Sequence, residues 1–293
     1  MTEEYHARVE QLPWVDPAPR HGLLEVFRRR YLLRLLVRRE ISARYSGSFL
    51  GLIWSYINPL SQLFIYWFVM QKIIGRGGEN FAVHVFSAIV VVHFFTETFN
   101  AGTRSIVRNK AIVRKMAMPT EMFPVASMLV SLYHVGPQLI ILMAVCLPYG
   151  WMPDLGGLLA FLIALAIAMV LGTALALLFS AANVFFRDWA SAVNIMTNFV
   201  RFGAPMIYPY SIVDERFGSF AEYYLINPIA NAVLLSQRAF WVGTTNDPDH
   251  TAATDLPDHL YSRGLIVLVA CVLFLAVAQM IFTKLEHKIP ERI

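Results

Sequence analysis

Long runs of apolar residues, separated by short charged patches, are the feature that most restricts how this chain can fold. About 20 consecutive apolar residues cross the ~30 Å hydrocarbon layer of a bilayer, and several runs reach that length. Inside lipid the backbone must satisfy its own hydrogen bonds, so such runs form helices. Only 15% of the residues are charged and 57% are hydrophobic, unlike an ordinary soluble domain. The sequence therefore predicts an all-α, polytopic membrane protein.

Six transmembrane helices are predicted, over residues 49–72, 83–104, 122–147, 158–182, 190–210 and 263–283. With these spans, 18 of the 24 Lys and Arg residues lie on one side, five lie on the other, and Arg201 falls within the fifth span. Positive charge is retained on the cytoplasmic side. We therefore expect a multi-pass protein of the cytoplasmic (inner) membrane with both termini cytoplasmic. The same rule accounts for the net charge of +4 without a nucleic-acid partner.

The segment before the first span divides into two parts. Residues 1–21 are polar, contain three prolines and predict a cytoplasmic arm. Residues 22–45 are basic and amphipathic, which is typical of a helix that lies in the membrane surface. Such a helix could be a simple juxtamembrane anchor or could also dock a partner. The candidate contacts to anionic headgroups or a partner are Arg28, Arg34, Arg38 and Arg39.

The six-helix domain, residues 46–283, contains three informative connections and is followed by a cytoplasmic tail, residues 284–293. Residues 105–119 are basic and contain a helix-capable stretch that ends at Pro119. This connection could be a plain positive-inside loop or an element that a partner pushes on. Residues 211–243 are too apolar for an exposed loop and too short to cross, so they predict an external re-entrant segment broken at Asn227-Pro228. Residues 244–260 are rich in turn formers and predict an exposed external loop.

Motifs for catalysis or metal binding are missing from the sequence. No glycine precedes a lysine, so there is no P-loop, and neither HExxH, GxSxG nor a Cys/His cluster with metal spacing occurs. We predict no catalytic residue, no metal site and no cofactor in this chain. Charges inside a membrane are expensive and usually functional, and only Glu97 and Arg201 qualify. So few buried acids argue that a partner supplies the energy for any transport.

Aromatic residues are dense on several predicted spans. Flat rings can stack on the C–H faces of sugars and could line a path for a glycan. Interfacial belts, lipid contact or core packing explain the same residues equally well. The candidates for lining a channel are Trp54, Phe64, Phe95 and Tyr208.

Several short motifs, in order along the chain, resemble those of the permease subunits of type-2 ABC transporters. The resemblance is strongest to exporters of O-antigen, teichoic acid, capsule and cell-wall galactan, and it covers roughly residues 22–290. The matching positions in the N-terminal part are Arg44-Tyr45, Leu50-Gly51, Trp54 and Pro59. The later matching positions are Asn109, Arg114-Lys115, Pro119, Arg187-Asp188, Pro205, Tyr208 and Asn227-Pro228.

The resemblance implies a permease that moves a lipid-linked polysaccharide across the cytoplasmic membrane. Two copies would pair around a channel within the membrane lipids. Each copy would dock a separate ATPase subunit, which binds ATP and Mg. The missing P-loop fits a permease without ATPase activity of its own. The residues that the resemblance assigns to coupling with the ATPase are Arg108, Asn109, Lys110, Arg114, Lys115 and Pro119.

The sequence is also compatible with other functions. A type-2 ABC permease for drugs or simple lipids would share the same motifs. An integral-membrane glycosyltransferase would need acidic residues at one membrane face, and Asp247-Pro248-Asp249 has the DxD spacing but lies among turn formers. A purely structural assembly protein would not need a basic loop suited to coupling. The sequence does not identify which glycan would be exported.

Overall fold

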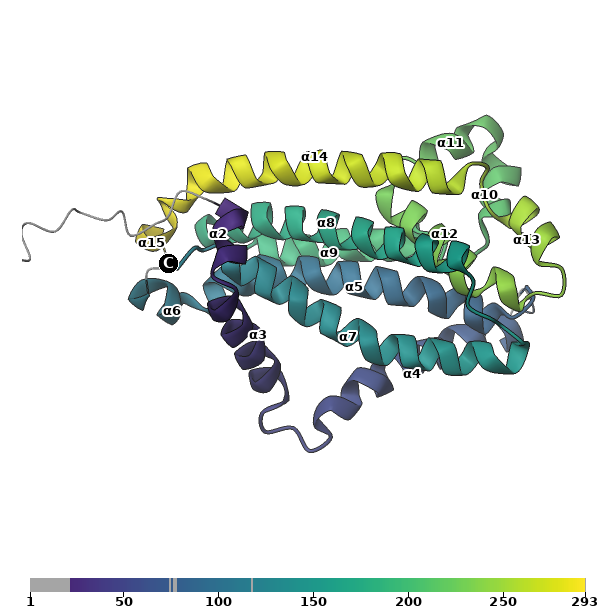
Figure 1. Cartoon of the computed structure of the whole chain (residues 1–293), viewed down its shortest axis with the longest axis horizontal. Coiled ribbons are helices and arrows are strands. Elements are labelled where there is room, and N and C mark those ends of the chain that lie inside the picture. Colours follow the sequence, from purple (N-terminus) through teal and green to yellow (C-terminus); the bar gives the residue numbers. More distant parts are fainter. Residues whose placement is uncertain (1–21, 74, 76–77, 117, 293) are drawn as a thin grey trace, which may run out of the picture.

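A computed structural model describes residues 22–73, 75, 78–116 and 118–292, so the predicted arm 1–21 lies outside the described residues. All regular secondary structure in these ranges is helical, without a strand. The long helices run side by side along the longest axis of the molecule (Figure 1). The prediction of an all-α chain is confirmed.

Four helices in the described part are long and apolar enough to cross a membrane. They are α5 (Phe81–Arg108), α7 (Met122–Cys146, continued by a 3-10 turn, Leu147–Tyr149), α8 (Leu155–Phe185) and α14 (Leu260–Glu286). These four helices coincide with the predicted second, third, fourth and sixth spans. The chain is thus a multi-pass membrane protein by the length and composition of its helices.

The predicted first and fifth spans correspond to shorter helices. A 3-10 turn (Gly51–Ile53) precedes α4 (Trp54–Trp67), which continues as a six-residue π-helix, η2 (Phe68–Ile73). Helix α9 (Trp189–Gly203) has 15 residues, or roughly 22 Å at 1.5 Å per residue. It ends before the predicted limit of residue 210 because Pro205 favours an extended conformation at Ala204, which has ψ 148°. A count of six spans therefore stays a prediction.

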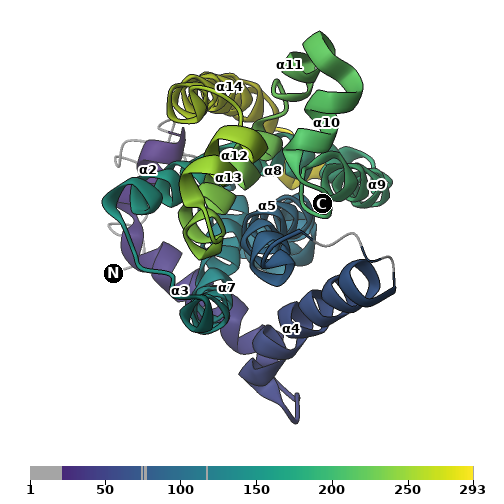
Figure 2. The same ribbon diagram turned by 90° about the vertical axis from the view of Figure 1, so that its right-hand side faces the viewer.

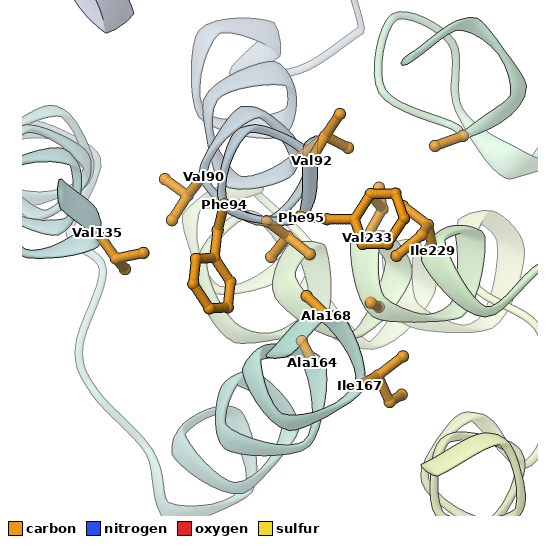
Figure 3. Close-up of a cluster of buried hydrophobic side chains, with 14 of the residues drawn as sticks. Val90, Val92, Phe94, Phe95, Val135, Ala164, Ile167, Ala168, Ile229 and Val233 are labelled. Carbon is orange, nitrogen blue, oxygen red and sulfur yellow. The ribbon is translucent and has the colours of Figure 1, made fainter. Parts of the chain in front are cut away.

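Helix α5 lies at the centre of the bundle and is buried over most of its length. It packs against α7, α8 and α12 (Pro228–Phe240), and Figure 3 shows the core that they share. Close approach to α8 depends on small residues, as is usual between membrane helices. A Cβ built on Gly102 would lie 2.4 Å from the Cβ of Ala176. The register of α5 against α8 is therefore fixed by sterics.

We predict that Gly102→Leu destabilises the protein by about 2 kcal/mol or more, because overpacking a tight helix contact forces both backbones apart. The matched control is Gly203→Ala in α9, since a Cβ there meets nothing within 4 Å. The control should be neutral or slightly stabilising, because alanine favours a helix by up to about 1 kcal/mol over glycine. Denaturation of both variants in the same detergent tests the pair, and equal stabilities would contradict the close contact.

The N-terminal amphipathic segment crosses the long helices at one end of the bundle (Figure 1). The sequence predicted one helix over 22–45, whereas the structure has α2 (Gly22–Arg28) and α3 (Arg30–Tyr45), separated at Arg29, where φ is −89° and ψ is 37°. The predicted amphipathic pattern is present. The apolar side chains exposed on the outer side are Leu24, Phe27, Tyr31 and Leu35, and those buried against the bundle are Val26, Leu33 and Leu36.

The end of the bundle formed by α6 (Lys110–Lys115), α2 and the C-terminal α15 (Ile289–Arg292) is called the α6 end below (Figure 1). The opposite end carries α10 (Tyr210–Phe217), α11 (Ala221–Tyr224) and α13 (Pro248–Asp255), with 3-10 turns at Gly218–Phe220 and Val242–Thr244. Figure 2 looks onto this opposite end. Within the predicted external loop 244–260 the structure has a helix, α13, where the sequence analysis expects only turns. Asp247 caps this helix by accepting a hydrogen bond from the His250 N–H at 3.1 Å.

Candidate functional site

Helix α6 presents a cluster of positive charge at the end of the bundle. It follows a break at Asn109, so the first four residues of the predicted loop 105–119 belong to α5. Arg108, Lys110, Arg114 and Lys115 are exposed, whereas Pro119 is buried. The side chain of Asn109 is also buried, and the residue is 4% exposed. The predicted coupling residues therefore divide into an exposed basic group and two buried residues at the joints of the connection.

Asn109 links α3 to the start of α6. Its Oδ1 accepts a hydrogen bond from Arg39 Nη1 at 3.0 Å, and its Nδ2 donates to Glu40 Oε1 at 3.0 Å. Glu40 also forms an ion pair with Arg108. We call these four residues the α3–α6 clamp. The clamp ties the amphipathic segment to the junction between α5 and α6.

A second polar contact, the Glu97 cluster, holds the C-terminal end of α3 deeper in the bundle. It comprises Arg44, Tyr45, His93, Glu97, His134 and Gln138. Arg44 pairs with Glu97, which lies 3.2 Å from His134 Nδ1. The opposite ring nitrogen, Nε2, lies 2.9 Å from the Tyr45 hydroxyl, and that hydroxyl lies 2.6 Å from Ser55 Oγ at the start of α4. The cluster therefore joins α3, α4, α5 and α7.

Of the two predicted intramembrane charges, Glu97 thus has partners on three elements. Arg201 lines a small pocket between α4, α5 and α9, beside Gln62, Tyr66 and His93. Both charges therefore face the side of α5 on which α4 packs.

A pair of carboxyl groups, Glu121 and Glu286, lies at the α6 end, just before α7 and at the end of α14. Glu286 Oε1 accepts hydrogen bonds from the backbone N–H and the hydroxyl of Thr120 at 3.1 and 2.9 Å, and Gln279 Nε2 donates to Glu121 Oε1 at 2.9 Å. Burial raises the pKa of Glu121 above its usual range, and the negative charge of Glu286 raises it further. The pair therefore links the start of α7 to α14 best when Glu121 is protonated.

This raised pKa predicts a pH dependence of stability. Between the ordinary carboxyl pKa of about 4.3 and the raised value, the folded state binds more protons than the unfolded state, so stability falls as the pH rises through this range. We expect a lower melting temperature at pH 8 than at pH 5. Glu121→Gln, which keeps the shape and the Gln279 contact, should flatten the difference, while Glu215→Gln on the exposed part of α10 should leave it unchanged. An equally steep dependence in Glu121→Gln would assign the effect elsewhere.

The four predicted channel-lining aromatics occupy different environments. Phe64 is 60% and Trp54 is 46% exposed, both on α4. Tyr208 is half-buried, and its hydroxyl lies 3.1 Å from that of Tyr224. Phe95 is 2% exposed and lies beside Ile229 and Val233 of α12 in the core (Figure 3). Its assignment to a channel surface was wrong, because the spacing on α5 does not reveal that α12 covers that face.

Asn227-Pro228, the predicted break of a re-entrant segment, lies at the start of α12. Asn227 Oδ1 accepts a hydrogen bond from the Ile229 N–H at 3.0 Å, and Pro228 occupies the first turn, where its missing N–H costs nothing. Helix α12 is buried, and its Gln237 Nε2 donates a hydrogen bond to the Pro205 carbonyl at 2.8 Å.

The predicted headgroup contacts on the amphipathic segment, Arg28, Arg34 and Arg38, are exposed.

Sequence reasoning missed the pairing of Arg44 with Glu97 and the role of Glu40. Glu97 stood out as a buried acid, and Arg44-Tyr45 belonged to a motif, but nothing in the sequence joined them. Within the described ranges, no three His, Cys, Asp or Glu side chains are grouped so that they could hold a metal ion.

Comparisons with known proteins agree with the membrane architecture. The family model described as "ABC-2 type transporter" matches residues 31–240. A relative from Klebsiella pneumoniae, named "O-antigen export system permease protein RfbA", is 25% identical over 261 residues, which cover 89% of this chain and 94% of the relative. A protein of the same name from Myxococcus xanthus is 26% identical over 217 residues, covering 74% of this chain and 83% of the relative.

Proposed function

Because the chain belongs to the ABC-2 type transporter family, we propose that it is the membrane-spanning permease of an ATP-driven exporter of a lipid-linked polysaccharide. The relatives that match most of its length are named as O-antigen export permeases, which supports this substrate class. O-antigen, teichoic acid and cell-wall galactan all share the lipid-linked form.

The observation that carries the proposal is the connection of the exposed basic α6 to α3 through the α3–α6 clamp. A separate ATPase subunit would dock on α6, with Lys110, Arg114 and Lys115 at the contact. Its movement would reach α3 through Asn109 and then the bundle through the Glu97 cluster. Arg28, Arg34, Arg38 and Arg39 would hold α2 and α3 against anionic headgroups and the ATPase.

Two copies of the chain would enclose the path, together with two ATPase subunits. With α4 extended by η2, and with α9, each copy would cross the membrane six times, with both termini on the cytoplasmic side. The segment from α10 to α12 would be the external re-entrant part. The lining candidates are Trp54 and Phe64 of α4, which are exposed within one copy, and Tyr208, which is half-buried.

Charge reversal on α6 tests the coupling. Lys110→Glu/Lys115→Glu should abolish co-purification of the ATPase subunit, because both exposed cations would become anions at the docking surface. The matched control is Lys72→Glu/Arg216→Glu, which makes the same charge change at exposed residues near the opposite end. Glycan export by the control should continue. Retained co-purification and export in the α6 variant would rule out docking at this helix.

A further inference from the structure

A pocket with a polar lining lies between α3, α5 and α7, and it is bounded by the α3–α6 clamp and the Glu97 cluster. Its volume is about 320 Å³, far more than a single water requires. Its polar lining includes Arg39, Arg44, Arg108, Asn109 and Ser127. On α5 it reaches from Asn109 to Ala101, about 12 Å along the helix axis. It therefore extends from the α6 end into the bundle.

The charge of the pocket favours an anion. Three arginines line it, against the single carboxylate of Glu40, and Glu97 behind Arg44 supplies one more negative charge. A guanidinium has five N–H donors, and the contacts to Asn109, Glu97 and Glu40 use one donor on each arginine. The side chains of Arg44 and Arg108 are 47% and 51% exposed, so their remaining donors can reach a ligand. Arginine is the residue best suited to bind phosphate through paired hydrogen bonds.

An independent observation points to a polar ligand. Ser127 of α7 lines the pocket and is 3% exposed, yet its Oγ has no hydrogen-bond partner among the described residues. A buried hydroxyl without a partner costs about 1–3 kcal/mol, and such groups are rare in native structures. The neighbouring Ser131 differs, because its hydroxyl donates to the Ser127 carbonyl at 3.0 Å. The Oγ is itself buried, so rotation of the Ser127 side chain toward the pocket would let a ligand oxygen satisfy it.

We propose that this pocket binds the phosphate or pyrophosphate group of a lipid-borne molecule, with Arg39, Arg44, Arg108 and Ser127 as its ligands. The exposed apolar residues Tyr31 and Leu35 lie on the same helix as Arg39 and Arg44 and suit a lipid-facing entrance. The phosphate chemistry rests on the pocket alone, whereas the choice of a lipid pyrophosphate as the preferred source rests on the proposed function. Occupancy would bridge the clamp and the Glu97 cluster, so binding would stiffen the link between α3 and α5.

Binding of radiolabelled inorganic pyrophosphate to the complex of permease and ATPase, in nanodiscs of zwitterionic lipid, tests the pocket. A saturating non-hydrolysable ATP analogue keeps the nucleotide sites occupied. We expect saturable binding of pyrophosphate. Ser127→Ala should weaken the affinity roughly tenfold, because it removes one hydrogen bond to a charged group. Arg39→Gln should weaken the affinity by at least as much. The matched control is Ser180→Ala on α8, whose hydroxyl donates to the Leu177 carbonyl at 2.9 Å away from the pocket. It should bind as the unaltered protein does.

Ser127→Ala removes only an unpartnered hydroxyl and should melt no lower than the unaltered protein, which separates lost binding from misfolding. A complex without saturable binding, or with equal affinities in Ser127→Ala and the unaltered protein, would overturn the proposal. Nanodiscs with added prenyl pyrophosphate or phosphatidylglycerol identify the source, since the lipid that occupies the pocket displaces the label. If the label fails to bind but glycan export persists, the pocket is wrong and the proposed function stands. If binding depends on Ser127 but no glycan is exported, the phosphate site stands and the proposed function is wrong.

Discussion

Replacing Glu97 with leucine is expected to cost about 3 kcal/mol of folding stability, because it leaves His134 and Arg44 without their shared acceptor in the interior. The loss of one partner from a buried ion pair costs roughly 3–5 kcal/mol. The lower end applies here, since the side chain of Glu97 is 10% exposed but that of Arg44 is 47% exposed and partly solvated. Glu97→Gln should cost less, because an amide can still accept from His134. Equilibrium denaturation in mixed micelles measures both variants.

The control for this prediction is Glu215→Leu, which removes an exposed carboxylate from α10. A double variant, Glu97→Leu with Arg44→Met, provides a second check. If the ion pair is the cause, Arg44→Met should be much less harmful in the Glu97→Leu background than alone, because contacting residues do not act additively. Additive losses, or a Glu97→Leu variant as stable as Glu215→Leu, would show that the cluster does not hold α3 to the bundle.

The hydropathy pattern predicts the positions of those helices that are set by long apolar runs. Helices α5, α7, α8 and α14 appear where the apolar runs lie, and α12 begins at Asn227-Pro228, where the sequence marks a break. The ends of α9 and the division of α2 from α3 were missed. Both depend on local backbone geometry, at Ala204 and Arg29, which a long hydropathy window averages away.

The site was less predictable, because it depends on contacts between residues far apart in the sequence. Glu40 and Asn109 are separated by 69 residues, and Glu97 and Arg44 by 53. A periodic pattern on one helix cannot say which neighbour covers each face. For that reason Phe95, an aromatic on a predicted span, was taken for a channel residue although α12 buries it. The resemblance placed Asn109 and Arg108 in a coupling region. Their partners, Arg39 and Glu40 of α3, are brought to them by the packing of α3 against α7.

The α3–α6 clamp leads to the second large expected effect, which is an effect on function. Asn109→Ala removes the hydrogen bonds from Arg39 and to Glu40 while leaving the exposed basic residues of α6 in place. The ATPase subunit should therefore still co-purify and hydrolyse ATP. Glycan export per ATP hydrolysed should fall roughly tenfold, the size of a coupling free energy of between 1 and 2 kcal/mol. Parallel assays of hydrolysis and export in proteoliposomes give this ratio.

A loss of export could also follow from a less stable bundle, and Asn231→Ala separates the two causes. Asn231 is buried near the opposite end, where its Nδ2 donates to the Asn227 carbonyl at 3.0 Å, so its loss should lower stability to a similar degree. If the clamp transmits the movement of the ATPase subunit, Asn231→Ala should reduce ATP hydrolysis and glycan export together and leave their ratio unchanged. Only Asn109→Ala should continue to hydrolyse ATP while exporting much less glycan for each ATP. A normal ratio in Asn109→Ala would mean that α6 acts on the bundle through α5 and α7 directly, and that α3 follows their movement without carrying it.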